Sequence, residues 1–141
     1  MTRPEWATRA PAKPGVRRPI LLVLDDQPEI AALVARWLSD LGDVHSATTS
    51  AQAFTLANVV EPDLAILDVI VPRVDGLELV AALRRNPRLT RMRVIFITGS
   101  DRIDIPLRAA EAGAVLLYKP LEEDTLRATV RSVLAGEVER A

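Results

Sequence analysis

Short aliphatic runs alternate with amphipathic stretches along most of this chain, and that alternation limits the possible folds more than any other feature. An uninterrupted apolar run of four or five residues is typical of a strand buried on both faces. Parallel pairing of such strands needs a long crossover, which the amphipathic stretches can supply as helices. The expected strands are Ile20–Leu24, Leu64–Leu67, Val94–Ile97 and Val115–Tyr118, with a weaker one near Val44–Ala47.

The amphipathic stretches carry apolar residues at helical spacing together with helix boundary signals. The first runs from Ile30 to Leu41, and Gly42 is predicted to stop it. Ser50 is predicted to cap the second, which ends by Pro62. Three more helices are expected. The third contains Leu77–Leu83, the fourth begins near Pro106 and ends at Gly113, and the fifth contains Leu126–Leu134.

Five such strand–helix units predict an α/β protein with a doubly wound (βα)5 architecture. Right-handed crossovers place helices on both faces of an open, parallel, five-stranded sheet, which gives a three-layer sandwich. The 141 residues are enough for one domain with one continuous core, and the sequence has no internal repeat. We therefore predict a single folded domain.

The first 18 residues differ from the rest of the chain. They contain Pro4, Pro11 and Pro14, and five basic residues against one acidic residue, without helical or strand periodicity. We therefore predict a flexible basic arm at 1–18, a folded domain at 19–136 and a C-terminal tail at 137–141.

Composition removes several classes of function. The chain has no cysteine, which excludes disulfides, thiol catalysis and thiolate metal sites. Its formal net charge of −1 gives no argument for direct nucleic-acid binding or for a membrane partner. No apolar run approaches the roughly 18 residues that a membrane-spanning helix needs. We expect a cytoplasmic location.

Polar side chains follow four of the five predicted strands. Asp25 and Asp26 follow the first, Asp68 the third, Thr98 the fourth and Lys119 the fifth. Each alone can be an ordinary cap, turn or surface residue. Because the carboxyl ends of parallel strands share one edge, where ligands bind in open α/β sheets, the set together predicts one functional site.

The residue types at this edge predict phosphate chemistry. Clustered carboxylates repel each other unless a cation lies among them, and oxygen ligands without His or Cys favour Mg²⁺. Lys119 and Thr98 offer a positive charge and a hydrogen-bond donor for phosphate oxygens. Asp68 lies centrally and is the candidate nucleophile, because a carboxylate can form an aspartyl phosphate.

Four stretches, LLVLDD, AILDVIVPRVDGLEL, VIFITGS and LLYKP, resemble the receiver (CheY-like) domain of two-component response regulators. The resemblance covers residues 19–136. After Asp68 it includes Pro72 four residues on and then Asp75-Gly76; Pro72 and Gly76 are structural positions beside the site. It implies the flavodoxin-like strand order 2-1-3-4-5.

Carried over position by position, the resemblance implies a role for each residue of the predicted site. Asp68 resembles the phospho-acceptor. Thr98 and Lys119 resemble the residues that bind the phosphoryl group and switch the domain. The implied Mg²⁺ ligands are Asp25, Asp26, Asp68 and the backbone carbonyl of Ile70.

The resemblance also sharpens three local expectations. It implies a cis peptide bond between Lys119 and Pro120, against a base rate of about 5% for X–Pro bonds. The family's switch aromatic is replaced by Leu116, so Leu116 and Tyr118 are possible switch residues, although Tyr118 also fits ordinary packing. Ile70 replaces a polar side chain that can orient water, which predicts slow self-hydrolysis.

The function implied is a phosphorylation switch rather than an enzyme. A histidine kinase or histidine phosphotransfer protein would phosphorylate Asp68, and the modified surface would bind a downstream protein. Two alternatives stay open: an Mg²⁺-dependent aspartyl-phosphate phosphatase, which Ile70 at the general-acid position disfavours, and a binding module independent of phosphorylation.

Ile103 and Ile105 are either partner-binding or core residues, and a homodimer through the helix 4–strand 5–helix 5 face stays possible. Because only AGEVERA follows Leu134, the chain is either a free-standing receiver or a piece of a longer protein.

Overall fold

The computed structural model describes residues 17–136, which form one five-stranded parallel sheet in the order β2-β1-β3-β4-β5. The predicted fold class and the strand order implied by the resemblance are confirmed. The strands are β1 Ile20–Leu24, β2 Asp43–Ala47, β3 Leu64–Asp68, β4 Arg93–Thr98 and β5 Val115–Tyr118. The helices are α2 Pro28–Trp37, α3 Ser50–Val60, α4 Gly76–Leu83, the 3-10 helix η1 Pro87–Leu89, α5 Asp104–Glu111 and α6 Glu123–Leu134.

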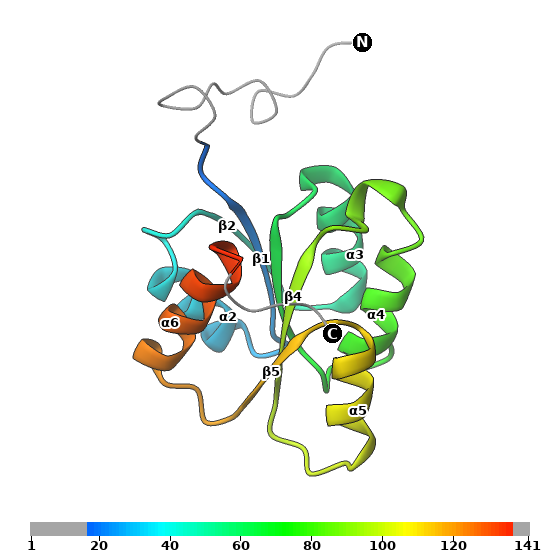
Figure 1. The fold of residues 1–141 in the computed structure, drawn as a ribbon. Helices are drawn as coiled ribbons and strands as arrows, with labels where there is room; N and C mark the ends of the chain where they lie inside the picture. The colour runs from blue at the N-terminus through cyan, green and yellow to red at the C-terminus, as the bar shows by residue number, and fades with distance from the viewer. Residues whose placement is uncertain (1–16, 137–141) are drawn as a thin grey trace.

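Helices cover both faces of the sheet, α2 and α6 on one side and α3, α4 and α5 on the other (Figure 1). Alternation along each strand divides the apolar residues between two cores. In β4, Phe96 packs in the core with α3, α4 and α5, whereas Ile95 and Ile97 pack in the core with α2 and α6. The central strands β1, β3 and β4 are therefore apolar on both faces, which explains their uninterrupted aliphatic runs.

The parallel register aligns the carboxyl ends of the central strands. Leu24 of β1 pairs with Leu67 of β3, and Asp68 of β3 pairs with Ile97 of β4. The residues that end β1, β3 and β4 therefore reach the same edge of the sheet.

The first predicted helix is shorter than expected, and its stop signal has another role. Helix α2 ends at Trp37, and Leu38 is its C-cap although its side chain is fully buried. Apolar spacing continues past the helix end because the turn after it also faces the core. Gly42 is needed for close approach: a Cβ there would lie 2.5 Å from the Pro19 carbonyl oxygen.

The predicted cap of the second helix is also wrong by one residue. Thr49 is the N-cap, with extended backbone and a side chain that accepts a hydrogen bond from the Gln52 amide. Ser50 is the first helical residue and donates its hydroxyl to the Val74 carbonyl instead. Either hydroxyl could cap a helix, so tertiary contact decides between the two neighbours.

Most of the predicted arm, residues 1–16, and the predicted tail, residues 137–141, lie outside the described residues. The last two arm residues pair with the domain: Arg17 contacts Asp63 at 2.8 Å and Arg18 contacts Asp43 at 3.0 Å. Within residues 17–136, every helix is too short or too polar to cross a membrane.

Candidate functional site

Four of the predicted site residues meet at the carboxyl edge of the sheet. Carboxylate oxygens of Asp25, Asp26 and Asp68 all lie within 4.8 Å of one another. The Lys119 Nζ donates to Asp68 Oδ2 at 2.8 Å and reaches Asp25 Oδ2 at 3.4 Å. Residues up to 94 positions apart in the chain thus form one cluster of three acidic groups and one basic group.

Backbone amides orient two of the carboxylates. Asp68, the last residue of β3, is 4% exposed, and its Oδ1 accepts a hydrogen bond from the Ile70 amide at 3.1 Å. Asp25 is also buried, and its Oδ1 accepts from the Gln27 amide at 2.9 Å. Each carboxylate therefore has one oxygen fixed by the backbone and the other directed to Lys119. Asp26 is exposed, so water can reach the cluster.

The loop from β3 to α4 is held close to Asp68 by Gly76. The Gly76 amide donates to the Val69 carbonyl at 2.8 Å, and a Cβ at Gly76 would lie 2.6 Å from the Asp68 carbonyl oxygen. Any larger residue would push this backbone apart. Asp75 caps α4 by accepting from the Glu78 amide at 2.8 Å. In the Asp75-Gly76 pair, the aspartate thus caps the helix and the glycine allows the close backbone approach.

Thr98 and Lys119 lie at the neighbouring strand ends. Thr98 is fully buried, and its Oγ1 accepts a hydrogen bond from the Ser100 amide at 3.0 Å. The Lys119 amide donates to the Thr98 carbonyl at 2.8 Å, which joins β5 to β4 at this edge. The Lys119–Pro120 peptide is cis, as the resemblance implies.

Burial and charge act against each other at Asp68 and Lys119. Burial raises the pKa of the Asp68 carboxyl, and the nearby Asp25 charge adds to it; the hydrogen bond and charge of Lys119 oppose this rise without cancelling it. Burial alone would lower the pKa of Lys119, but its hydrogen bonds and charge interactions with Asp68 and Asp25 outweigh burial, so its pKa is raised. The ammonium is therefore fully charged at neutral pH.

The acidic cluster has the donors that a hard divalent cation needs. Its ligand atoms are all carboxylate oxygens, and one of its three residues is open to solvent for coordinating water. A single lysine cannot neutralise three carboxylates. The residues present therefore fit Mg²⁺.

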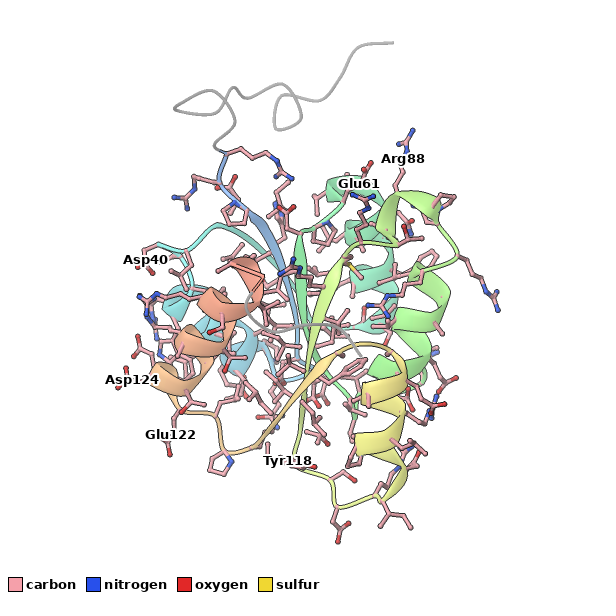
Figure 2. All side chains as sticks on the ribbon, viewed as in Figure 1. Asp40, Glu61, Arg88, Tyr118, Glu122 and Asp124 are labelled. Carbon is pink, nitrogen blue, oxygen red and sulfur yellow. The ribbon has the colours of Figure 1, made fainter. Side chains whose placement is uncertain are left out.

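The two possible switch residues lie in different environments. Leu116 is partly buried and packs against the core that contains Phe96. Tyr118 pairs with Thr98 in the strand register but is 56% exposed, and Figure 2 shows it at the sheet edge that carries the site. The two isoleucines near the start of α5 also differ in exposure. Ile105 is 1% exposed and belongs to the core, whereas Ile103 is 94% exposed.

Sequence reasoning missed the contacts that hold the site loops. The amides of Gln27 and Ile70 give no sequence signal, because every non-proline residue has one. Arg73, at φ 75°, lies in the left-handed region that usually takes Gly or Asn, so an arginine there gave no turn signal. The hydroxyl of Ser50 on the Val74 carbonyl ties α3 to the same loop. Its signal, three consecutive hydroxyl residues at the start of a helix, was ambiguous.

Comparison with known proteins agrees with this geometry. The sequence model of the response regulator receiver domain matches residues 21–131, which is most of the described chain and includes every predicted site residue. The chain belongs to the response regulator receiver family. It is therefore a phospho-acceptor domain of the kind that acts in two-component signalling.

Proteins similar to this receiver include a transcriptional regulator and a chemotaxis protein. The DNA-binding dual master transcriptional regulator RpaA of Synechocystis sp. is 34% identical over 118 residues, covering 82% of this chain and 49% of RpaA. Protein PilH of Pseudomonas aeruginosa is 29% identical and is covered over 98% of its length. The Vibrio cholerae chemotaxis protein CheY4 has a TM-score of 0.76 at 27% identity, covering 82% of this chain and 98% of CheY4. This receiver thus spans about half the length of RpaA and nearly all of PilH.

Proposed function

We propose that this receiver accepts a phosphoryl group on Asp68 and uses it to change its affinity for a partner protein. The observation that carries the proposal is the Asp68 carboxylate, fixed by the Ile70 amide on one oxygen and by Lys119 at 2.8 Å on the other. A nucleophile held in this way loses little entropy when it attacks, and positioning is most of what phosphoryl transfer requires.

The reaction forms one bond and breaks one. A carboxylate oxygen of Asp68 attacks phosphorus, and the P–N bond of a phosphohistidine, or the P–O bond of acetyl phosphate, breaks with its electron pair going to the leaving group. The histidine then takes a proton, whereas acetate leaves as an anion. Lys119 and the Thr98 hydroxyl would bind the phosphoryl oxygens on Asp68.

We assign the cation site to Mg²⁺, held by Asp25, Asp26, Asp68 and the backbone carbonyl of Ile70. When bound, the ion neutralises negative charge on the phosphoryl oxygens and on the carboxylates around them. The cluster of carboxylate oxygens within 4.8 Å supports this assignment.

Phosphorylation would exchange the partner of Lys119. In the unmodified protein its ammonium contacts Asp68 and Asp25; after modification, phosphoryl oxygens compete for it and for the Thr98 hydroxyl. Thr98 pairs with Tyr118 in the register, so a shift of Thr98 reaches the exposed surface at β5. The added charge biases the domain toward a state that makes better contacts with it.

The partners we propose are a histidine kinase or histidine phosphotransfer protein and a downstream protein, in the cytoplasm. The exposed apolar side chains of Ile103, Leu107 and Tyr118, at α5 and β5, support a protein contact there, including a homodimer through the α5–β5–α6 face. We propose no catalytic turnover, because Ile70 has no acidic group at the position where an aspartyl-phosphate phosphatase carries its general acid.

The decisive experiment is intact-mass measurement after incubation with acetyl phosphate and Mg²⁺. We expect a gain of one phosphoryl group in the parent and no gain in Asp68→Ala. Asp101→Ala, which removes an exposed carboxylate from the loop after β4, is the matched control and should be phosphorylated like the parent. No gain in the parent, or an equal gain in Asp68→Ala, would overturn the proposal and favour a phosphorylation-independent binding module.

A further inference from the structure

An arginine-rich hollow lies at the end of the molecule opposite the phospho-acceptor edge. The segment 84–93 contains five arginines, and it leads from the end of α4 into β4. A cavity of about 620 Å³ opens beside it, where β1, β3 and β4 begin. Figure 2 shows Glu61 and Arg88 at this end and Tyr118 at the other. The charged residues that line the hollow are Arg17, Glu61, Asp63, Arg88, Arg91 and Arg93.

Two of the lining arginines are anchored. Arg17 donates two hydrogen bonds to the two carboxylate oxygens of Asp63, at 3.1 and 2.8 Å. Arg93 donates to the carbonyl of Val133 in the last turn of α6. These contacts fix both guanidinium groups in the wall of the hollow without a bound ligand.

The other two arginines are available. Within residues 17–136, the Arg88 guanidinium has one polar contact, to Glu61 at 3.4 Å, and most of its side chain is exposed. Arg91 is exposed, and within residues 17–136 its side chain forms no hydrogen bond or ion pair. Among the described residues that line the hollow, four guanidinium groups thus face two carboxylates, Glu61 and Asp63, which is an excess of two positive charges.

The remaining lining is apolar. Pro62 and Met92 are buried, and Pro19 and Leu134 complete the wall. An apolar wall beside free guanidinium groups suits a ligand with an organic part and a compact, doubly charged anionic group.

From this arrangement we propose that the hollow binds a small molecule that carries a phosphate group. Arginine recognises phosphate by paired hydrogen bonds, and a phosphate monoester near neutral pH carries about two negative charges. An extended polyanion such as duplex DNA fits less well, because Glu61 and Asp63 would repel its backbone. This site is separate from the one at Asp68, and the inference does not depend on the proposed function.

The test is titration of residues 1–141 by isothermal calorimetry, with the amide shifts followed by NMR. The probes are AMP, inorganic phosphate and inorganic pyrophosphate, so that an organic phosphate is distinguished from the free anion. EDTA is present throughout to remove divalent cations. Without a cation, the carboxylates of Asp25, Asp26 and Asp68 repel anions, so the probes are kept from that site. We expect saturable binding with shifts concentrated at residues 61–63 and 88–93.

Variants separate a built site from general charge attraction. Arg88→Gln and Arg91→Gln should each weaken binding about tenfold or more, since each removes a charged hydrogen bond. Arg85→Gln is the matched control: Arg85 is exposed and neighbours the hollow in sequence but does not line it, so less than about a twofold change is expected. Lys119→Ala, which removes the cation at the other end, should leave binding unchanged.

Four results would overturn the proposal. They are the absence of saturable binding by all three probes, equal weakening in Arg85→Gln, loss of binding in Lys119→Ala, and tighter binding of a 20-base-pair DNA duplex than of any small phosphate. Thermal unfolding of each variant confirms that the exposed substitutions leave the fold intact.

Discussion

An ionised Asp68 destabilises the folded protein, because its carboxylate is buried beside Asp25 and only partly compensated by Lys119. Its folded pKa is raised, so its contribution to stability is favourable at low pH and is lost as the pH rises through the folded pKa. Removing the charge should therefore stabilise the protein at neutral pH.

We expect Asp68→Asn to have a larger free energy of unfolding than the parent at pH 7 in EDTA. The difference should shrink as the pH falls toward 3.8, the ordinary pKa of an aspartate, where the parent carboxyl is protonated too. Urea unfolding of both proteins between pH 3.5 and 8 measures this. A variant that is less stable than the parent at pH 7 would show that Lys119 more than compensates for burial.

Ile70 is predicted to slow the loss of the phosphoryl group. It lies two residues after Asp68 and is 44% exposed, so its side chain borders the site without a group that could orient water. Ile70→Asn supplies such a group and should speed decay by roughly several-fold. The measurement is intact mass over time after removal of acetyl phosphate. Ile70→Val is the control, and equal decay of all three proteins would contradict the prediction.

At the scale of elements, Gly42 sets the start of the β1–β2 pairing. The Asp43 amide donates to the Pro19 carbonyl at 2.8 Å, and a Cβ at Gly42 would lie 2.5 Å from that oxygen. Gly42→Ala should destabilise the protein by roughly 1–3 kcal/mol, because backbone rather than a flexible side chain must move.

Gly99 provides the comparison, because a Cβ there would meet only the Lys119 side chain, at 3.7 Å. Gly99→Ala should change the free energy of unfolding by less than about 0.5 kcal/mol. Urea denaturation compares Gly42→Ala and Gly99→Ala with the parent. A loss in Gly99→Ala as large as that in Gly42→Ala would mean that close approach is not the cause.

Strands were more predictable than helix ends, for a physical reason. A strand buried on both faces is apolar at nearly every position, so β1 begins and ends where its aliphatic run does, at Ile20 and Leu24. Helix α2 ends at Trp37 although buried Leu38 continues its apolar pattern, because burial does not require helical backbone. Likewise, Ile105 is buried in the core, whereas Ile103, two residues earlier, is exposed. The sequence did not separate them because the direction of a side chain at a helix start depends on the residue at which the helix begins.

At the scale of the whole molecule, the site depends on strand order. The sequence alone predicted that Asp25, Asp68, Thr98 and Lys119 follow strands, and that parallel strand ends share an edge. Contact of Lys119 with both Asp68 and Asp25 also requires β1, β3 and β4 to be neighbours, with β5 beside β4. No single residue encodes that order, which followed from resemblance. The backbone donors at Asp25 and Asp68 depend on the folded loops and could not be predicted at all.

The carboxylate cluster also predicts that Mg²⁺ stabilises the entire domain. The three oxygens come together only on folding, since Asp25 and Asp68 are 43 positions apart, so the cation should bind the folded state far better than the unfolded chain. Mg²⁺ at tenfold above its dissociation constant should add about 1.4 kcal/mol to the free energy of unfolding.

For a domain of this size, that energy corresponds to a rise of about 5 °C in Tm. Thermal unfolding with MgCl2, and with NaCl at the same ionic strength, separates binding from screening of the acidic cluster. Asp26→Asn removes one ligand without opening the core, because Asp26 is exposed, and should lose most of the Mg²⁺ effect. Asp101→Asn, which removes an exposed carboxylate outside the cluster, should keep it. If NaCl raised Tm as much as MgCl2, or if Asp26→Asn responded like Asp101→Asn, the three carboxylates would repel one another without forming a cation site.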